Sequence, residues 1–260
     1  MSSEALPGER HAIILRLLQE EGRVLSAALA AHFGVSEDSV RRDLRELAAR
    51  GLCRRVHGGA LRITPAYAPL RERHDEGPQR KQALARCAVA QLGSAQSVLL
   101  DAGSTNTAFA AALPHDLALQ ILTNAPDIAL RLIDHPAVAV TVLGGRLHSR
   151  SGALLGAQAL QSLQLLRADV ACVGVCAMDS EGGLWAIDGE EAVLKREMHA
   201  RADRHVVMLS NEKLGAVASF RIGELDEHSV LVCEHDAPAG FVRALQRHGL
   251  QIVLAAPPST

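Results

Sequence analysis

Seven short apolar segments recur between residues 97 and 254 and are separated by stretches with helical patterning. They lie at 97–101, 118–122, 138–143, 169–175, 205–209, 229–233 and 251–254. A chain that alternates strands with helices crosses back over its sheet after each strand, so the strands pair in parallel and helices cover them. A further helix is expected before them, from about Arg80 to Leu92. The pattern therefore predicts an α/β domain with a mainly parallel, helix-covered sheet.

The first 63 residues have a different pattern, which predicts three short helices followed by two short strands. Apolar spacing indicates a first helix over 9–20, ended by Gly22, and a second over 27–32 with Ser26 as its N-cap. After a tight turn at Gly34, Ser36 is expected to cap a third helix that runs to about Arg50 and stops at Gly51. Residues 52–63 indicate two strands turning at 57–59, so the segment is predicted to be a winged helix-turn-helix.

Positive charge is concentrated in this segment. Residues 41–62 hold seven arginines and two acidic residues, whereas the whole chain has a net charge of −2. Val40, Leu44 and Leu47 would pack inward from the third helix and leave its basic side exposed. A solvated helix face is the alternative, but an arginine cluster at the start of such a helix is typical of a surface that enters the major groove. The candidate DNA-binding residues are Ser36, Ser39, Arg41, Arg42, Arg45, Arg54, Arg55 and His57.

Two strings of residues here resemble the signature of the DeoR-type family of bacterial transcriptional regulators. They are Ser36-x-x-Ser39-Val-Arg-Arg-Asp-Leu-x-x-Leu47 and Gly51-Leu-x-Arg-Arg-Val-His-Gly-Gly-Ala60. The match covers about 25 residues, and Ser39 stands where the family usually has threonine, which keeps the hydroxyl. The resemblance implies that the partner is double-stranded operator DNA.

Small polar residues follow three of the predicted strands. Asp101-Ala-Gly103-Ser104-Thr105-Asn106 comes after the first and opens a helix, Thr123-Asn124 follows the second, and Gly144-Gly145-Arg146 follows the third. Ligands of open α/β sheets collect at these strand ends, and a Gly/Ser/Thr loop at a helix start offers backbone N–H groups to an anion. The pattern favours an anion site, with a plain turn capped by Ser104 or Thr105 as the alternative.

Two of the three lysines in the chain, Lys195 and Lys213, lie in motif-like segments of this domain. Lys195 ends Glu-Ala-x-x-Lys, for which an exposed helix lysine is the alternative, and Lys213 lies in Ser210-Asn-Glu-Lys-Leu-Gly215. These segments and the strand-end loops are similar to blocks of the DeoR-type effector domain, although Ser210 replaces the usual aspartate. The resemblance, over about residues 7–235, implies a fold similar to sugar-phosphate isomerases and a phosphorylated sugar or sugar derivative as effector. The candidate effector-binding residues are Asp101, Gly103, Ser104, Thr105, Asn106, Thr123, Asn124, Gly144, Gly145, Lys195 and Lys213.

The expected organisation is a winged helix-turn-helix over 1–62, a linker with three prolines over 63–79, and an effector-sensing and oligomerisation domain over 80–260. Operators generally offer two symmetric half-sites, so a homo-oligomer, dimer or tetramer, is expected. Five scattered cysteines and the dispersed histidines give neither a disulfide framework nor metal-ligand spacing, so no metal or cofactor is predicted. With no secretory pattern at the start and no apolar run near ~18 residues, a cytoplasmic protein without a membrane partner is expected.

These patterns predict a DNA-binding transcriptional regulator with no catalytic residues, and the resemblance to the DeoR-type family implies a repressor of carbohydrate metabolism genes. The alternative is an enzyme, a sugar-phosphate isomerase or deaminase fused to a DNA-binding module. Asp101, Asp188 or Lys213 would then supply the acid and base groups. An activator is the third possibility.

Overall fold

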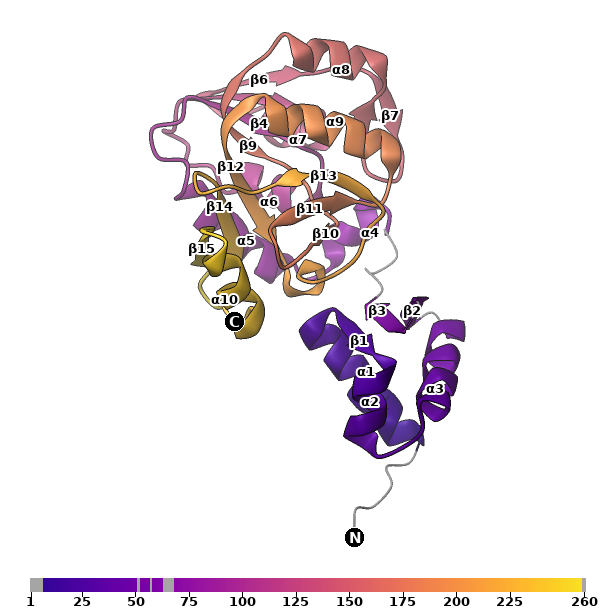
Figure 1. Cartoon of the computed structure of the whole chain (residues 1–260). Coiled ribbons are helices and arrows are strands. Elements are labelled where there is room, and N and C mark those ends of the chain that lie inside the picture. The colour runs from indigo at the N-terminus through magenta and orange to yellow at the C-terminus, as the bar shows by residue number, and fades with distance from the viewer. Residues whose placement is uncertain (1–6, 51, 57, 63–67, 259–260) are drawn as a thin grey trace.

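The computed structural model describes residues 7–258 apart from residues 51, 57 and 63–67, and it shows two parts joined near residue 70 (Figure 1). The first part contains α1 (Pro7–Glu21), β1 (Arg23–Leu25), α2 (Ser26–Phe33), α3 (Glu37–Ala49), β2 (Cys53–Val56) and β3 (Gly59–Arg62). The three strands form an antiparallel sheet in the order β1-β3-β2. The predicted winged helix-turn-helix is confirmed, with β1 as an additional strand.

Apolar residues at helical spacing hold the first part together. Val40, Leu44 and Leu47 of α3 are buried, as predicted, and pack in one cluster with Ile14 and Leu18 of α1. Gly34 has a φ of 65°, which ends α2 in the left-handed conformation expected of the turn. Ser26 is not the N-cap of α2: the helix begins at Ser26 itself, Leu25 is the cap, and the Ser26 side chain is buried. The predicted stop at Gly51 and the turn residue His57 lie outside the described residues.

The predicted linker contains helical structure from residue 70 onward. Helix α4 (Leu70–Asp75) and helix α5 (Pro78–Val89) begin inside it, and α5 starts two residues before the predicted Arg80. The backbone N–H of Leu70 donates to the carbonyl of Arg150 at 2.8 Å, which fixes α4 against the second part. Pro69 is the N-cap of α4, and Pro78 is the first residue of α5, a position where proline is well tolerated.

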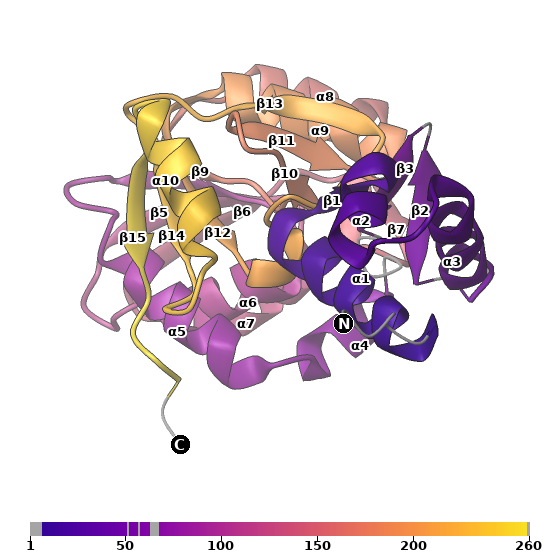
Figure 2. The same cartoon turned by 60° about the horizontal axis from the view of Figure 1, so that its bottom comes forward.

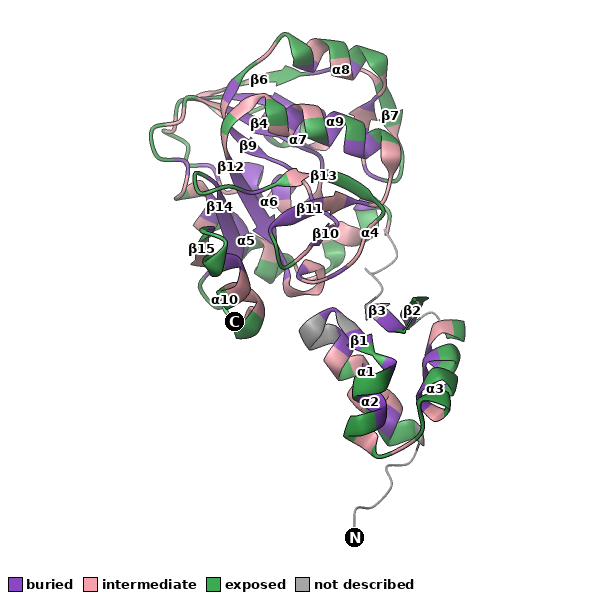
Figure 3. Cartoon of the chain, in the orientation of Figure 1, coloured by how far each residue is buried: buried purple, intermediate pink, exposed green. Residues whose placement is uncertain are grey.

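Seven parallel strands form the sheet of the second part, and each corresponds to one of the seven predicted segments. They are β4 (Ser97–Leu100), β5 (Leu119–Thr123), β6 (Val138–Val142), β9 (Ala168–Cys172), β12 (Ala202–Leu209), β14 (Val230–Cys233) and β15 (Gln251–Leu254). Their spatial order is β15-β14-β12-β9-β4-β5-β6, so the chain reverses direction across the sheet next to β4. Central strands are buried along their length, which is why they are continuous apolar runs (Figure 3).

Helices cover both faces of this sheet. α5, α6 (Ser104–Ala111) and α7 (Pro126–Arg131) pack side by side on one face, and α8 (Ala157–Gln164) and α9 (Gly189–Ala200) pack together on the other (Figure 2). Helix α10 (Ala239–Arg247) lies beside β14 and β15. In the described part of the chain, no helix is long and apolar enough to cross a membrane.

Short antiparallel strands complete the second part. β7 (Arg146–His148) pairs with β8 (Ala153–Leu155), and β10 (Ala177–Met178), β11 (Gly183–Ala186) and β13 (Phe220–Glu224) form a three-stranded sheet. A 3₁₀ helix at Asn211–Lys213 lies on the loop after β12. These pieces were not predicted, because they are short and are not continuous apolar runs like the strands of the parallel sheet.

Candidate functional site

The exposed side of α3 carries the charge expected of a DNA-contacting helix. Arg42 and Arg45 are exposed, while Arg41 pairs within the helix with Glu37 at 2.9 Å and Asp38 at 3.1 Å. Ser36 caps the helix, since its Oγ accepts from the N–H of Ser39 at 3.2 Å. The two hydroxyls also hydrogen bond to each other at 3.0 Å. Arg42 and Arg45 are therefore the side chains of this face best placed to reach outward.

The wing lies beside α3 and adds two exposed arginines, Arg54 and Arg55 of β2. A cavity of about 370 Å³ lies between β2 and α3, and Arg41 and Arg55 both line it with Gly58 and Gly59. Positive charge therefore continues from the helix into the wing. His57, the last candidate of this surface, lies outside the described residues.

A second cavity, the strand-end cavity, lies at the carboxyl ends of β4, β9 and β12. It is lined by Arg73, Ala102, Gly103, Ser104, Thr105, Asn106, Gly174, Val175, Cys176, Glu191, Lys195, Met208 and Lys213. Ser104 is the first residue of α6, so Gly103 is the N-cap and neither Ser104 nor Thr105 takes that place. Backbone N–H groups at a helix start together with hydroxyls are groups that bind anions.

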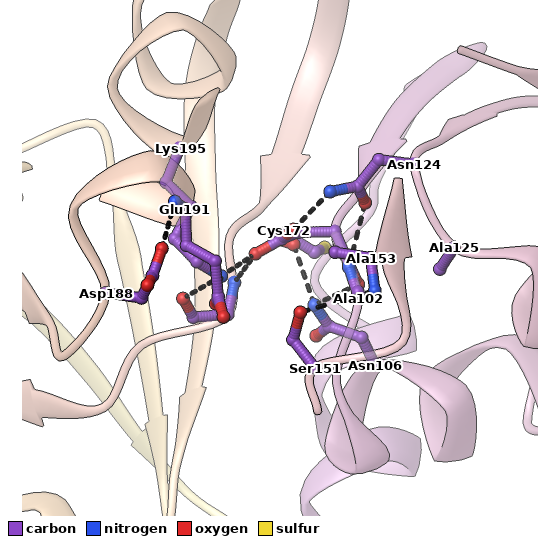
Figure 4. Close-up of polar contacts among 12 residues, drawn as sticks. Ala102, Asn106, Asn124, Ala125, Ser151, Ala153, Cys172, Asp188, Glu191 and Lys195 are labelled. Atoms are coloured by element: carbon purple, nitrogen blue, oxygen red, sulfur yellow. Dashed lines mark hydrogen bonds and ion pairs between the residues drawn. The ribbon is translucent and has the colours of Figure 1, made fainter. Parts of the chain in front are cut away.

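A buried hydrogen-bond network builds the floor of this cavity (Figure 4). The Asp101 carboxylate accepts from Asn124 Nδ2 at 3.0 Å, from the N–H of Gly174 at 2.8 Å and from Lys195 Nζ. Asn124 Oδ1 accepts from the N–H of Ala102 at 3.0 Å, and Asn106 Nδ2 donates to the carbonyls of Asp101 and Cys172 at 2.8 and 2.9 Å. These contacts fix the loop 101–106 and explain why polar residues follow the strands.

Three basic side chains face the strand-end cavity with one acidic side chain. Lys195 Nζ donates to the carbonyl of Gly174 at 2.8 Å and lies 3.8 Å from Glu191 Oε2. Burial by itself lowers the pKa of Lys195, but the carboxylates of Asp101 and Glu191 outweigh it and raise that pKa above its ordinary value. For Lys213, burial lowers the pKa, and the like charges of Arg73 and Lys195 lower it further. An anion placed here would relieve the crowding of positive charge.

The predicted effector residues fall into two groups. Gly103, Ser104, Thr105, Asn106, Lys195 and Lys213 line the cavity, which brings together residues as far apart as 103 and 213. Asp101, Thr123 and Asn124 are buried beneath it, and Thr123 Oγ1 donates to the carbonyl of Leu100 at 2.6 Å. Gly144 and Gly145, between β6 and β7, do not line it. The structure shows Asp101, Thr123 and Asn124 supporting the loop from below, and direct contact of these residues, Gly144 or Gly145 with an effector stays a prediction.

Sequence reasoning missed Arg73 and Glu191. Arg73 comes from α4, in what was expected to be linker, and nothing in its local sequence marks it. Glu191 precedes Lys195 by one helical turn, and that spacing could have indicated the pair.

Asp188, an acid/base candidate of the enzyme alternative, caps α9 by accepting from the N–H of Glu191 at 2.9 Å. At Ser210 the hydroxyl donates to Glu212 Oε1 at 2.6 Å, so a carboxylate is still held at this block.

The two parts of the chain touch next to this cavity. Gly22, which joins α1 to β1 with a φ of 74°, packs so closely on Gly215 that a Cβ at residue 22 would overlap the Gly215 carbonyl. Gly215 lies two residues after Lys213, and its N–H donates to the carbonyl of Met178 at 2.8 Å. One short loop therefore carries a cavity cation and contacts the winged helix-turn-helix.

Comparisons with known proteins match each of the two parts of the chain to a family model. Residues 10–66 match the model of the DeoR-like helix-turn-helix domain, and residues 76–235 match that of the DeoR C-terminal sensor domain. The chain is 29% identical over 247 residues to the glycerol-3-phosphate regulon repressor of Escherichia coli strain K12, covering 95% of this chain and 98% of that repressor. It is 31% identical over 253 residues to the HTH-type transcriptional regulator GlpR of Haloferax volcanii, covering 95% and 98%. A ribose 5-phosphate isomerase structure from Methanocaldococcus jannaschii matches with a TM-score of 0.40 and 15% identity, covering 54% of this chain and 55% of the isomerase.

Proposed function

The chain belongs to the DeoR family of DNA-binding transcriptional regulators, and from that premise we propose that it represses carbohydrate metabolism genes until a phosphorylated sugar binds its strand-end cavity. The observation that carries the effector half is the cavity itself, where the start of α6 faces Arg73, Lys195 and Lys213. The relative in Escherichia coli bears the name of a glycerol-3-phosphate regulon repressor, which is in keeping with a phosphorylated effector.

Operator DNA binds, in this proposal, to the exposed side of α3 and to the wing. Arg42 and Arg45 read base edges in the major groove, since arginine forms paired hydrogen bonds with guanine. Arg54 and Arg55 contact phosphates, which supplies affinity that falls with salt. Arg41 contributes less, because Glu37 and Asp38 already neutralise its charge.

The Arg42→Ala and Arg45→Ala variants are each expected to weaken binding to a selected operator duplex by roughly 1–3 kcal/mol. Fluorescence anisotropy with a duplex selected from random DNA by the wild-type protein measures this effect. Arg243→Ala, an exposed arginine of α10 in the other part, serves as the matched control. If a variant that combines Arg42→Ala and Arg45→Ala binds the operator as tightly as this control, α3 is not the helix that contacts the bases.

The effector's phosphoryl group binds, we propose, at Ser104 and Thr105, with Lys195 and Lys213 supplying positive charge. The Lys213→Ala and Ser104→Ala variants remove one charge-assisted hydrogen bond each, which is worth roughly 1.5–3 kcal/mol and predicts a ten- to hundredfold loss of affinity. Calorimetry against hexose and pentose phosphates checks the loss. The unphosphorylated sugar is the control ligand, and equal binding of sugar and sugar phosphate would refute this site.

The effector is bound and not turned over in this proposal. Asp101 is committed to Asn124, Gly174 and Lys195, and Asp188 is committed to the start of α9, so neither carboxylate is placed to accept a substrate proton. Steady conversion of any sugar phosphate by the purified protein would overturn this assignment in favour of the isomerase or deaminase alternative.

Oligomerisation is assigned to the second part. β6 is an edge strand of the seven-stranded sheet, and Leu130, Ile133 and Val142 are exposed on or beside α7 and β6. Exposed apolar side chains at an open sheet edge are typical of an interface. Sedimentation equilibrium is expected to give two or four times the chain mass of 27.6 kDa, and a monomer at operator-binding concentrations would contradict the assignment.

The effector signal passes, we propose, through the loop 210–216. Effector binding changes DNA affinity only if it favours one arrangement of the two parts over another. An anion on Lys213 acts two residues from Gly215, and Gly215 contacts Gly22 between α1 and β1. This contact therefore joins the loop that carries Lys213 to the part of the chain that binds DNA.

A further inference from the structure

A third cavity adjoins the strand-end cavity across Ser104. This helix-side cavity has a volume of about 360 Å³ and is formed by α4, α5, α6 and α7. Its lining residues are His74, Pro78, Lys81, Gln82, Arg86, Ser104, Thr107, Ala108, Ala111, Ala112 and Arg131. Ser104 lines both cavities, and the neighbouring residues Arg73 and His74 of α4 line one each. The two cavities therefore lie on either side of the first turn of α6.

Every charged or titratable side chain among the described lining residues of the helix-side cavity is basic. Arg86 and Arg131 are exposed and make no ion pair within the part of the chain that the structure describes. Lys81 is half-buried and donates to the carbonyl of Arg73. The carboxylate of Asp127 borders this wall: it lies 3.6 Å from His74 Nε2 and accepts from Thr107 Oγ1 at 2.7 Å. The wall therefore carries three basic side chains, Lys81, Arg86 and Arg131, together with the imidazole of His74.

These basic groups repel one another. The pKa of Lys81 is lowered to about 8, chiefly by burial. The like charges of Lys213 and Arg73 also lower this pKa, whereas the carboxylates of Glu76 and Glu212 raise it. The pKa of His74 is also lowered, first by burial. The charges of Lys81, Arg73 and Arg131 lower this pKa further, whereas the carboxylate of Asp127 raises it. A dianion in the helix-side cavity would relieve this repulsion and gain charge-assisted hydrogen bonds.

We propose that the helix-side cavity binds a second phosphoryl group, so that the effector is a sugar carrying two phosphoryl groups, one on each side of Ser104. The first group occupies the strand-end cavity, and this inference rests on the proposed function for that cavity. Lys81, Arg86 and Arg131 hold the second group. A separate inorganic phosphate would satisfy the same cations, and the experiment below distinguishes the two sources.

The test compares wild type with the Arg86→Gln/Arg131→Gln variant, and Arg243→Gln is the matched control for loss of an exposed arginine. The probes are inorganic phosphate, fructose 6-phosphate, glucose 6-phosphate and the 1,6-bisphosphates of both sugars, measured by calorimetry. In wild type and the control, a bisphosphate is expected to bind at least tenfold more tightly than its monophosphate. The double variant should bind both alike, at the monophosphate's affinity.

The remaining outcomes distinguish the helix-side anion site, the effector with two phosphoryl groups, and the strand-end site. Two inorganic phosphates per chain in wild type and one in the double variant, without tighter binding of either bisphosphate, would retain the anion site but overturn the two-phosphoryl effector. One phosphate per chain in every protein, with monophosphate and bisphosphate binding alike, would overturn the helix-side site and leave the strand-end site standing. If Lys213→Ala leaves monophosphate and phosphate binding unchanged, the failure belongs to the proposed function of the strand-end cavity instead.

Discussion

Replacing Lys195 by methionine is expected to lower the free energy of unfolding by about 3–5 kcal/mol, because it leaves buried negative charge without its cation. Lys195 is 5% exposed and Asp101 1% exposed, and Nζ contacts Asp101 and the carbonyl of Gly174 and lies near Glu191. Asp101 would keep only Asn124 and the N–H of Gly174 as partners for its carboxylate. Urea unfolding followed by circular dichroism measures the change.

The pH dependence of this deficit follows from the raised pKa of Lys195. A lysine with a higher pKa in the folded state stabilises the protein fully below its unfolded pKa of ~10.4 and loses that contribution as pH rises through the folded pKa. The difference between wild type and Lys195→Met should therefore stay constant from about pH 7 to pH 9 and shrink above ~10.4. Arg196→Met, on the exposed side of the same helix, is the control and should change stability by less than ~0.5 kcal/mol. A Lys195→Met protein as stable as that control would disprove the buried pair.

In the winged helix-turn-helix, Asp43→Ala is expected to cost about 3–5 kcal/mol and to abolish operator binding. Asp43 lies on the buried side of α3 and accepts from Arg10 Nε at 2.8 Å and Nη2 at 3.1 Å, both within the domain core. The substitution removes both of these hydrogen bonds from a guanidinium that is itself 9% exposed. Because this pair joins α1 to α3, its loss would leave α3 without the contact that fixes it against α1.

Thermal unfolding and operator anisotropy on the same samples measure this effect. Glu46→Ala is the matched control, since its carboxylate is on the same helix and 56% exposed, and it should keep both stability and operator binding. Near-normal operator affinity for Asp43→Ala would show that the Arg10–Asp43 pair does not hold α3 in place.

The parallel sheet was predictable because its strands are buried on both faces. Such strands are continuous apolar runs, so Ser97–Leu100 or Val230–Cys233 can be recognised without any knowledge of their neighbours. The short hairpin strands β7 and β8 have no comparable signal, because three residues cannot show a period. Their pairing is visible only in the structure.

Asp43 shows a second limit of sequence reasoning. In the printed sequence it lies among arginines, and no nearby residue marks Arg10 as its partner. The structure places it beneath α3, where Arg10 reaches it from 33 residues away. Pairing over that distance leaves no local pattern, so only the packing of α1 against α3 reveals it.

The candidate effector site was predictable in its loops and not in its far wall. Strand order brings the loop 103–106 together with Lys195 and Lys213, and small polar residues after buried strands indicate such a meeting point. Arg73 enters from a helix that was expected to be linker, and Thr123 and Asn124 support the loop from below. Which polar residue contacts the ligand and which fixes the backbone is decided by three-dimensional placement alone.

A ligand in the second part of the chain is expected to change DNA affinity in the first, through the contact between Gly22 and Gly215. Operator affinity measured with and without a saturating sugar phosphate tests it most directly. In wild type the effector is expected to change the dissociation constant by about 5- to 150-fold. Gly22→Ala should lose this response, whereas Gly34→Ala, another positive-φ glycine with open space around it, should keep it. If the operator affinity stays constant while the effector saturates its site, the two parts of the chain are not coupled.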